Sequence, residues 1–298
     1  MIRNMAKLSE YIKLARPNHY VKNGFVWIPL FFGHKLNDLQ AVFNTFWAFF
    51  AFCLTASVVY VLNDLLDVQE DRLHPVKKLR PIASGSITSK QATRFLLIFL
   101  VLAISLSFIF LSNNILFILM AYLFLNLAYS FSLKHIAVID VVCIATGFVL
   151  RVFAGGIAAE VPVSHWLVIM VFLLAIFLAL AKRRDDLILN AQGHNKARRS
   201  LPNYNMDFVS HSMVAMTSIT IVSYILYTVS PEVVSKHGTN QLYLTTFWVV
   251  IGFLRYMQIT FVHQISGSPT TVLLRDIFLQ VVLVLWLITF YLLLYVFN

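Results

Sequence analysis

The sequence predicts an all-α polytopic membrane protein, and three observations lead to this fold class. Of the 298 residues, 59% are hydrophobic and only 12% are charged, and the mean hydropathy is +0.79. These values are far too apolar for an ordinary soluble domain. Apolar stretches of about 20 residues, the length that crosses a bilayer as a helix, recur along the chain. Basic residues gather in the short segments between them.

The apolar stretches predict nine transmembrane helices. All but two of the 23 Lys and Arg residues, Lys35 and Lys236, then fall on one side of the membrane. The positive-inside rule makes that side cytoplasmic, with the N-terminus inside and the C-terminus outside. No linker or composition shift divides the chain, so we expect residues 1–298 to form one domain. The expected spans are 12–32, which is short and interrupted, 41–62, 92–112, 114–133, 137–158, 164–181, 209–230, 241–262 and 272–297.

The composition also argues against several classes of protein. The net charge of +10 does not indicate a nucleic-acid partner, because orientation in the membrane accounts for most of the positive residues. Cys53 and Cys143 lie inside expected spans, with no CxxC pair or His at metal spacing, which argues against disulfide and zinc roles. The first residues lack a hydrophobic core followed by a cleavage site, so we expect no removable signal peptide.

The segment from Asn63 to Gly85, NDLLDVQEDRLHPVKKLRPIASG, places many ionisable groups beside the second span. If the helix continues through its acidic part, Asn63, Asp67 and Asp71 share one face, because residues four apart are neighbours on a helix. Asp64, seven residues before Asp71, can join the edge of that face. Carboxylates with a carboxamide suit Mg²⁺, which completes its shell with water and substrate phosphate. We therefore expect Asn63, Asp67 and Asp71 to bind magnesium.

Donors for phosphate oxygens follow the acidic row. They are His74, Lys77, Lys78 and Arg80, and an Arg side chain can bind two phosphate oxygens at once. Acidic groups followed by basic groups would hold a magnesium pyrophosphate. The alternative is that this segment is only a helix end followed by a solvated charged loop. The four-residue spacing of the acidic residues, together with the basic run, makes that alternative less favoured.

Other polar residues are candidates for binding an anion. Arg151 lies eleven residues after Asp140 in the fifth span, about 16 Å along the helix axis. A charge at that depth should face a wet cavity or an anion. The alternative is a buried structural Asp–Arg pair between helices. The remaining candidates lie near cytoplasmic ends of spans, where anchoring in the membrane or a stop-transfer role is the alternative. They are Lys22, Asn23, Tyr129, Lys134, Lys182, Arg183 and Arg184; Arg16 lies beside Lys22 and is interpreted as an anchor.

These segments together resemble the UbiA superfamily of intramembrane prenyltransferases. The likeness rests on NDLLDVQED followed by KKLRP and covers residues 10–298. The resemblance implies nine transmembrane helices around a central cavity, Mg²⁺ as cofactor, and an isoprenoid substrate that enters from the lipid. From the charge asymmetry we expect a multi-pass protein of the cytoplasmic (inner) membrane, with its active site facing the cytoplasm.

Within the superfamily, the chain is similar to the polyprenyl-phosphate phosphoribosyltransferases, through RPNHYVKN, YSFSLKH, LALAKRRDDL and GSPTTVLLRD. Ordinary prenyltransferases carry a second DxxxD motif, whereas Asp185 and Asp186 are adjacent here. The resemblance implies transfer of 5-phosphoribose from 5-phosphoribosyl 1-pyrophosphate to a membrane polyprenyl phosphate, with release of pyrophosphate. Catalytic roles are expected for Asp67, Asp71, Lys78 and Arg80, and substrate-binding roles for Asp64, His74, Lys77 and the anion-binding candidates named above.

Two other functions stay open from the sequence. One is a prenyltransferase that moves a prenyl group from a prenyl diphosphate to an aromatic, quinone-precursor or heme acceptor. The other is a transporter in which Asp67, Asp71 and Arg151 form a coupling pathway. Transport is less favoured, because it does not call for acidic groups spaced for magnesium beside phosphate-binding bases.

Overall fold

The computed structural model describes residues 8–73, 76–191, 203–263 and 269–296, and every regular element in these ranges is helical, which confirms the all-α class. The α-helices are α1 (Leu8–Ala15), α2 (Ile28–Phe32), α3 (Leu39–Leu66), α4 (Val68–Leu73), α5 (Ser89–Phe110), α6 (Asn113–Phe131), α7 (Ile139–Ala158), α8 (His165–Ala191), α9 (Met206–Val229), α10 (Pro231–His237), α11 (Thr246–Gln258), α12 (Pro269–Arg275) and α13 (Ile277–Tyr291). Shorter 3₁₀ elements are η1 (Pro17–Trp27), η2 (Lys77–Leu79), η3 (Leu133–His135) and η5 (Gln241–Thr245), and π-helical turns are η6 (Ile259–His263) and η7 (Leu292–Val296).

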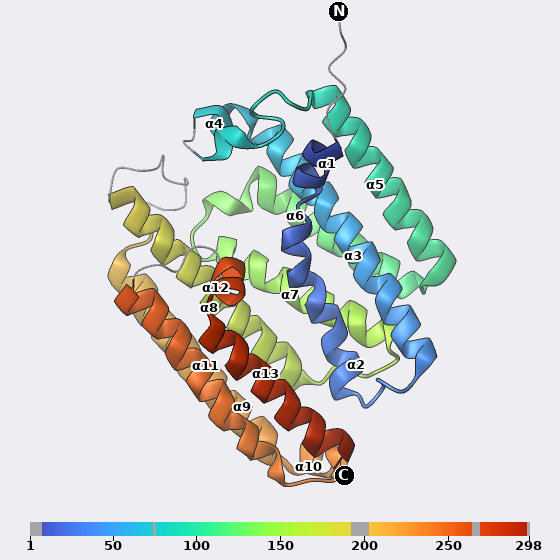
Figure 1. Ribbon diagram of the computed structural model, residues 1–298, viewed down its shortest axis with the longest axis vertical. Helices are drawn as coiled ribbons and strands as arrows, with labels where there is room; N and C mark the ends of the chain where they lie inside the picture. The colour runs from blue at the N-terminus through green and yellow to red at the C-terminus, as the bar shows by residue number, and fades with distance from the viewer. Residues whose placement is uncertain (1–7, 74–75, 192–202, 264–268, 297–298) are drawn as a thin grey trace, which may run out of the picture. The chain divides into compact units, whose positions relative to one another are not determined.

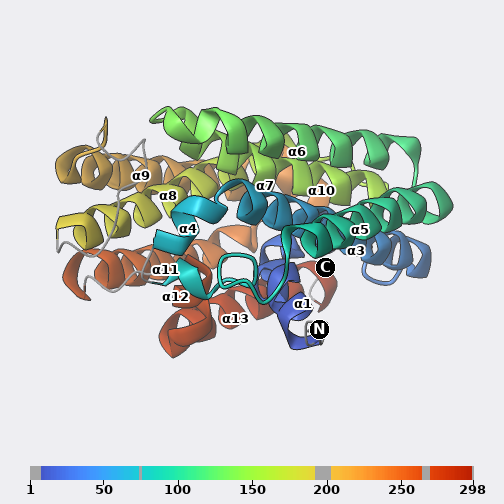
Figure 2. The ribbon, with the colours of Figure 1, turned by 90° about the horizontal axis from the view of Figure 1, so that it is seen from above.

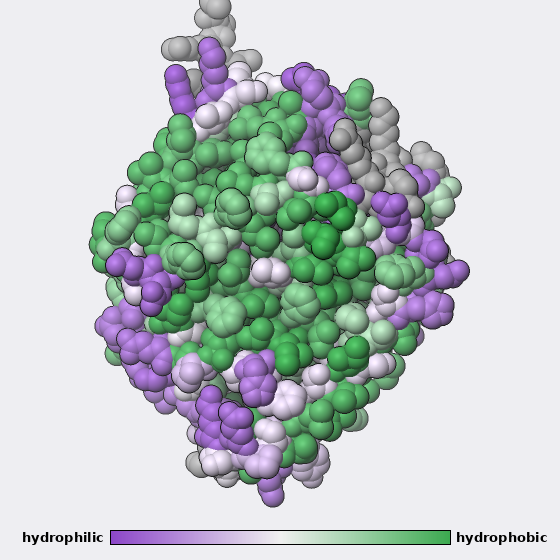
Figure 3. All heavy atoms as spheres, turned by 180° about the vertical axis from the view of Figure 1, so that it is seen from behind, coloured by the Kyte–Doolittle hydropathy of each residue, from purple (hydrophilic) through white to green (hydrophobic). Residues whose placement is uncertain are grey.

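Within the described residues, eight helical segments are long and apolar enough to cross a membrane. They are α3, α5, α6, α7, α8, α9, Gln241–His263 and Ile277–Val296. Many large apolar side chains on these segments are exposed, and Figure 3 shows hydrophobic side chains gathered over most of the face that it presents. Such exposure fits helices surrounded by lipid rather than water. The chain is therefore a multi-pass membrane protein.

The region of the first expected span, 12–32, is not one long helix. It consists of the end of α1, the 3₁₀ helix η1 and the short helix α2. Pro17 stands at the first position of η1, and Arg16 before it has a left-handed backbone with φ 55°. The count of nine spans and the orientation of the termini stay predictions.

The chain divides into two compact units. The first comprises Met1–Cys143, Leu150–Val163 and Gly193–Lys196, and the second comprises Ile144–Val149, Ser164–Gln192 and Ala197–Asn298. In the first unit, α3 packs against α5, α6, α1 and η1 (Figure 1). Small residues such as Ala48 and Ala51, both fully buried, allow this close packing around α3. The most enclosed helix of this unit is thus the one that leads into the acidic segment.

In the second unit, α8 packs against α9, and α11 packs against both α9 and α13 (Figure 2). Phe177 of α8 makes edge-on ring contacts with Phe253 and Tyr256 of α11. The Trp286 indole of α13 donates to the Tyr224 hydroxyl of α9 at 2.8 Å. These contacts join α8 to α11 and α9 to α13.

Candidate functional site

The acidic segment is not one continuous helix. α3 ends at Leu66, α4 begins at Val68, and Asp67 between them has φ −91° and ψ 8°. The expectation of an unbroken helix is therefore wrong at Asp67. The four-residue hydrogen bonds persist across the break, because the Asp67 N–H donates to the Asn63 carbonyl at 2.9 Å and the Asp71 N–H donates to the Asp67 carbonyl at 2.8 Å.

Two carboxylates of this segment share one guanidinium. Arg80 Nη1 lies 3.0 Å from Asp64 Oδ1 and 2.6 Å from Asp71 Oδ2. Both carboxylate side chains are only 2% exposed, whereas the Arg80 side chain is 28% exposed. The sequence predicted Asp64 only at the edge of the acidic face. In the structure, Asp64 and Asp71 are the two carboxylates at the centre of a cluster with Arg80.

Arg16 is a member of the cluster that sequence reasoning interpreted only as a membrane anchor. Its Nη2 lies 2.5 Å from Asp64 Oδ1, and its guanidinium carbon stands 5.3 Å from the centre of the Tyr60 ring. The left-handed backbone of Arg16 is uncommon for a residue other than glycine and costs free energy. The only signal for Arg16 in the sequence was its place before Pro17 and a polar stretch. That signal does not predict an ion pair with a carboxylate far along the chain.

The remaining acidic-row residues face η3 and α6. Lys134 Nζ lies 2.8 Å from Asp67 Oδ1, and the two side chains are 22% and 30% exposed. The Asn63 carboxamide oxygen accepts a hydrogen bond from the Ser130 hydroxyl. The sequence placed Lys134 at this face but gave no reason to select Ser130.

Arg151 is enclosed in the first unit and is 4% exposed. Its Nε donates to Asn23 Oδ1 at 2.8 Å and its Nη2 to the Tyr122 hydroxyl at 3.0 Å. The guanidinium also lies against the Phe52 and Tyr122 rings, at 5.5 and 4.6 Å from their centres. Asn23 in turn donates to the Cys53 sulfur at 3.2 Å. Neutral acceptors and aromatic faces therefore surround this buried cation.

Apart from His74, the other predicted site residues of the first unit lie on η1, η2 and α6. Lys78 is exposed on η2, and Tyr129 is half-buried on α6. Lys22 is half-buried on η1, and no described residue forms a hydrogen bond or ion pair with its ammonium group. Lys77 is half-buried on η2. His74 lies outside the described residues.

The second basic cluster lies in the second unit, on α8. Arg183 is fully buried and donates to Asp186 Oδ2 at 3.3 Å. Arg184 donates to the Thr260 carbonyl at 2.5 Å, and its guanidinium carbon lies 4.7 Å from the centre of the Phe261 ring. Lys182 is half-buried beside them. Arg183 and Arg184 therefore contact other groups of the second unit.

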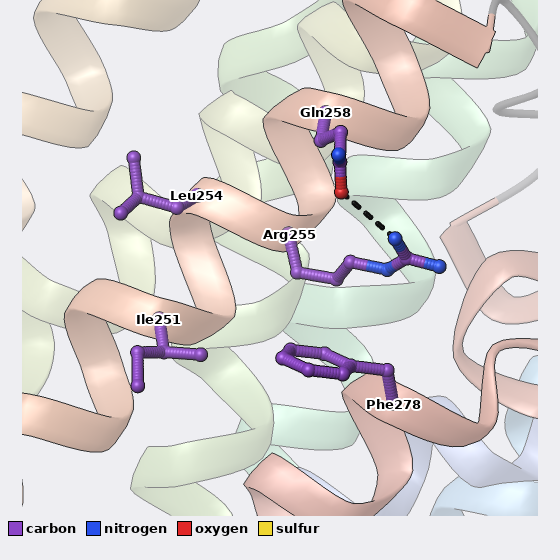
Figure 4. A pocket seen from close by; sticks show the side chains of 5 residues that line it. All are labelled: Ile251, Leu254, Arg255, Gln258 and Phe278. Carbon is purple, nitrogen blue, oxygen red and sulfur yellow. Dashed lines mark hydrogen bonds between the residues drawn. The ribbon is translucent and has the colours of Figure 1, made fainter.

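The second unit also has an open groove between α11 and α13. It has a volume of about 390 Å³ and is lined by Ile251, Leu254, Arg255, Gln258 and Phe278. Figure 4 shows the Arg255 side chain between Gln258 and Phe278. Arg255 donates to Gln258 and forms a two-point ion pair with Asp276. This hydrogen-bonded guanidinium holds the pKa of Asp276 below its ordinary value.

The donor set of the first unit is suited to a hard cation. No group of three His, Cys, Asp or Glu side chains arranged as a metal site occurs in the ranges that the structure describes. Cations already bind the carboxylates, through Arg16 and Arg80 on Asp64 and through Lys134 on Asp67. Asp64 Oδ2, however, is buried without a hydrogen-bond partner among the described residues. A buried carboxylate oxygen in that state fits a divalent ion, provided that the Arg80 side chain moves aside.

Comparisons with known proteins give a consistent result. The model of the UbiA prenyltransferase family matches residues 26–267. A decaprenyl-phosphate phosphoribosyltransferase of Mycolicibacterium smegmatis is 31% identical over 292 residues, covering 94% of this chain and 91% of the relative. The enzyme of the same name from Corynebacterium glutamicum is 32% identical over 283 residues, covering 92% and 83%. The solved structure of a UbiA homolog from Archaeoglobus fulgidus, bound to DMAPP and Mg²⁺, has a TM-score of 0.70 at 17% identity and covers 96% of this chain and 99% of that one.

Proposed function

Because this chain belongs to the UbiA prenyltransferase family, we propose that it is a phosphoribosyltransferase acting on a membrane lipid. The donor is 5-phosphoribosyl 1-pyrophosphate, the acceptor is a polyprenyl phosphate, and the products are polyprenyl phosphoribose and pyrophosphate. Two relatives named decaprenyl-phosphate phosphoribosyltransferase match almost the whole chain, which supports this substrate pair. The observation in the structure that supports it most is the buried pair Asp64 and Asp71 joined by Arg80.

The carboxylates are proposed to hold Mg²⁺ with the donor. Asn63, Asp67 and Asp71, together with Asp64, would supply the oxygen ligands, and Asp64 offers an oxygen without a hydrogen bond among the described residues. The bound ion would neutralise negative charge on the pyrophosphate. Arg80 and Lys134 then become available for phosphate oxygens, because each now binds a carboxylate that the ion would take over.

The reaction joins one oxygen of the acceptor phosphate to C1 of the ribose and breaks the bond from C1 to the pyrophosphate oxygen. The electron pair of the broken bond leaves with pyrophosphate. Arg80 and Lys134, with Lys77 and Lys78 on the neighbouring η2, stabilise the charge that develops on this leaving group. A phosphate monoester has a second pKa near 6, so at neutral pH the acceptor already carries its nucleophilic oxygen without a general base.

The test is a transfer assay in membranes that contain the full-length protein. With ribose-labelled 5-phosphoribosyl 1-pyrophosphate and polyprenyl phosphate, the label should enter the lipid extract. Asp67→Ala should reduce this product to about one hundredth or less, since loss of one preorganised charge-stabilising group costs about that factor. Asp207→Ala removes an exposed carboxylate at the start of α9 and serves as the matched control. Consumption of a prenyl diphosphate without any sugar donor would contradict the proposal and support an ordinary prenyltransferase.

A further inference from the structure

The element η1 is an unusually long 3₁₀ helix. It extends over 11 residues, Pro17–Trp27, whereas runs of this helix type beyond three or four residues are uncommon. With three residues per turn, side chains three apart stand directly above one another. One such stripe consists of Tyr20, Asn23 and Val26.

This stripe attaches η1 to α3. The Tyr20 hydroxyl lies 2.7 Å from the Ser57 hydroxyl, and Asn23 donates to the Cys53 sulfur. Val26 is fully buried. The orientation of η1 about its own axis is therefore fixed, and with it the direction of the neighbouring stripe.

The neighbouring stripe is basic and consists of Arg16, His19 and Lys22. At a rise of about 2 Å per residue, His19 and Lys22 of η1 are about 6 Å apart, and Arg16 is the left-handed residue that directly precedes η1. The N-terminal end of this stripe meets the acidic cluster, since Arg16 binds Asp64 at 2.5 Å. His19 in the middle contacts the Tyr60 ring, at 5.2 Å between ring centres.

Lys22 lies at the C-terminal end of the stripe. Two other cations, Arg151 and Arg16, repel its charge. Asp64 offsets the charge of Arg16. No described residue forms a hydrogen bond or ion pair with Lys22, so its own charge has no carboxylate partner in the described part of the chain. The next side chain, Val21, is apolar and 44% exposed. A cation among apolar groups near the membrane is stabilised by a bound anion.

We infer that the stripe Arg16, His19 and Lys22 binds the phosphate of the lipid acceptor, with Lys22 as its main contact. This inference rests on the proposed function and assigns the two phosphate substrates to different residues. A pyrophosphate donor requires a divalent ion and hence the carboxylates of the acidic segment. A phosphate monoester requires only cationic donors, and its prenyl chain keeps it beside apolar surface such as Val21.

The test uses the full-length protein in detergent and measures binding of a short-chain prenyl phosphate. Lys22→Met should raise its Kd and the acceptor KM about 10-fold or more, the effect of losing one charge-assisted hydrogen bond, while the KM of the sugar donor stays unchanged. Lys22→Arg should keep most of the affinity. Lys13→Met removes an exposed lysine of α1 that pairs with Glu10, and should change nothing.

The outcomes separate the two proposals. If the wild-type protein makes no ribosyl lipid but Lys22→Met still weakens prenyl phosphate binding, the proposed function fails and the acceptor site stands. If the wild-type protein transfers ribose and Lys22→Met changes only the donor KM, the acceptor site is wrong. Equal binding of the prenol without phosphate would also overturn it, as would inorganic phosphate binding as tightly as the prenyl phosphate. If Lys22→Met does not fold, His19→Gln tests the same stripe, with a smaller increase in the Kd of the prenyl phosphate expected.

Discussion

Replacing Arg80 by Gln should lower the unfolding temperature of the protein. It should also increase the rise in unfolding temperature that magnesium causes. Arg80 bridges Asp64 and Asp71, which are both 2% exposed. Asp71 has no other ion-pair partner among the described residues, whereas Asp64 keeps Arg16. Breaking a buried ion pair costs about 3–5 kcal/mol, and the 28% exposure of Arg80 reduces this to about 2–3 kcal/mol. We expect the unfolding temperature in EDTA to fall by roughly 5 °C.

Magnesium should restore part of this loss, because the ion and Arg80 compete for the same carboxylates. At about ten times its Kd, a ligand adds about 1.4 kcal/mol to the free energy of unfolding. The assay is thermal unfolding in detergent, followed by tryptophan fluorescence, with MgCl₂ compared with KCl at equal ionic strength. Asp71→Asn should lose the magnesium effect, and Arg72→Gln, an exposed neighbour, should behave like the wild type. The reasoning is refuted if Arg80→Gln unfolds at the wild-type temperature in EDTA, or if magnesium stabilises the wild type more than the variant.

Two further predictions concern packing and pH. Gly155→Ala should destabilise the first unit by about 3 kcal/mol, because an added Cβ would lie 2.0 Å from the Val26 carbonyl oxygen of η1, a backbone atom. Gly252→Ala, whose Cβ would meet an ordinary contact at 3.7 Å, should be neutral or slightly stabilising; thermal unfolding of the two variants distinguishes them. The folded-state pKa of Asp276 is lowered by Arg255, so its contribution to stability is complete above about pH 4 and is lost as pH falls through the folded pKa. Unfolding temperatures measured from pH 7 to pH 3 should therefore converge for the wild type and Asp276→Asn at the acidic end, and a constant difference would contradict this.

The sequence alone determined the fold class and the location of the acidic segment. Both follow from local properties of the chain, since apolar length and residue spacing are readable without any partner. The all-α class and the multi-pass topology are confirmed by the helices and their eight candidate spans in the described residues. The membership in the UbiA prenyltransferase family, expected from NDLLDVQED and KKLRP, is confirmed by the family match.

The tertiary structure decided which charges meet. Arg16, Asp64 and Arg80 are separated by 48 and 16 residues, so no periodicity of one helix could have shown that they form one cluster. The break at Asp67 and the left-handed backbone of Arg16 are likewise seen only in the folded chain. Hydrogen bonds and ion pairs depend on distances of about 3 Å, and only the folded chain fixes such distances between residues far apart in sequence.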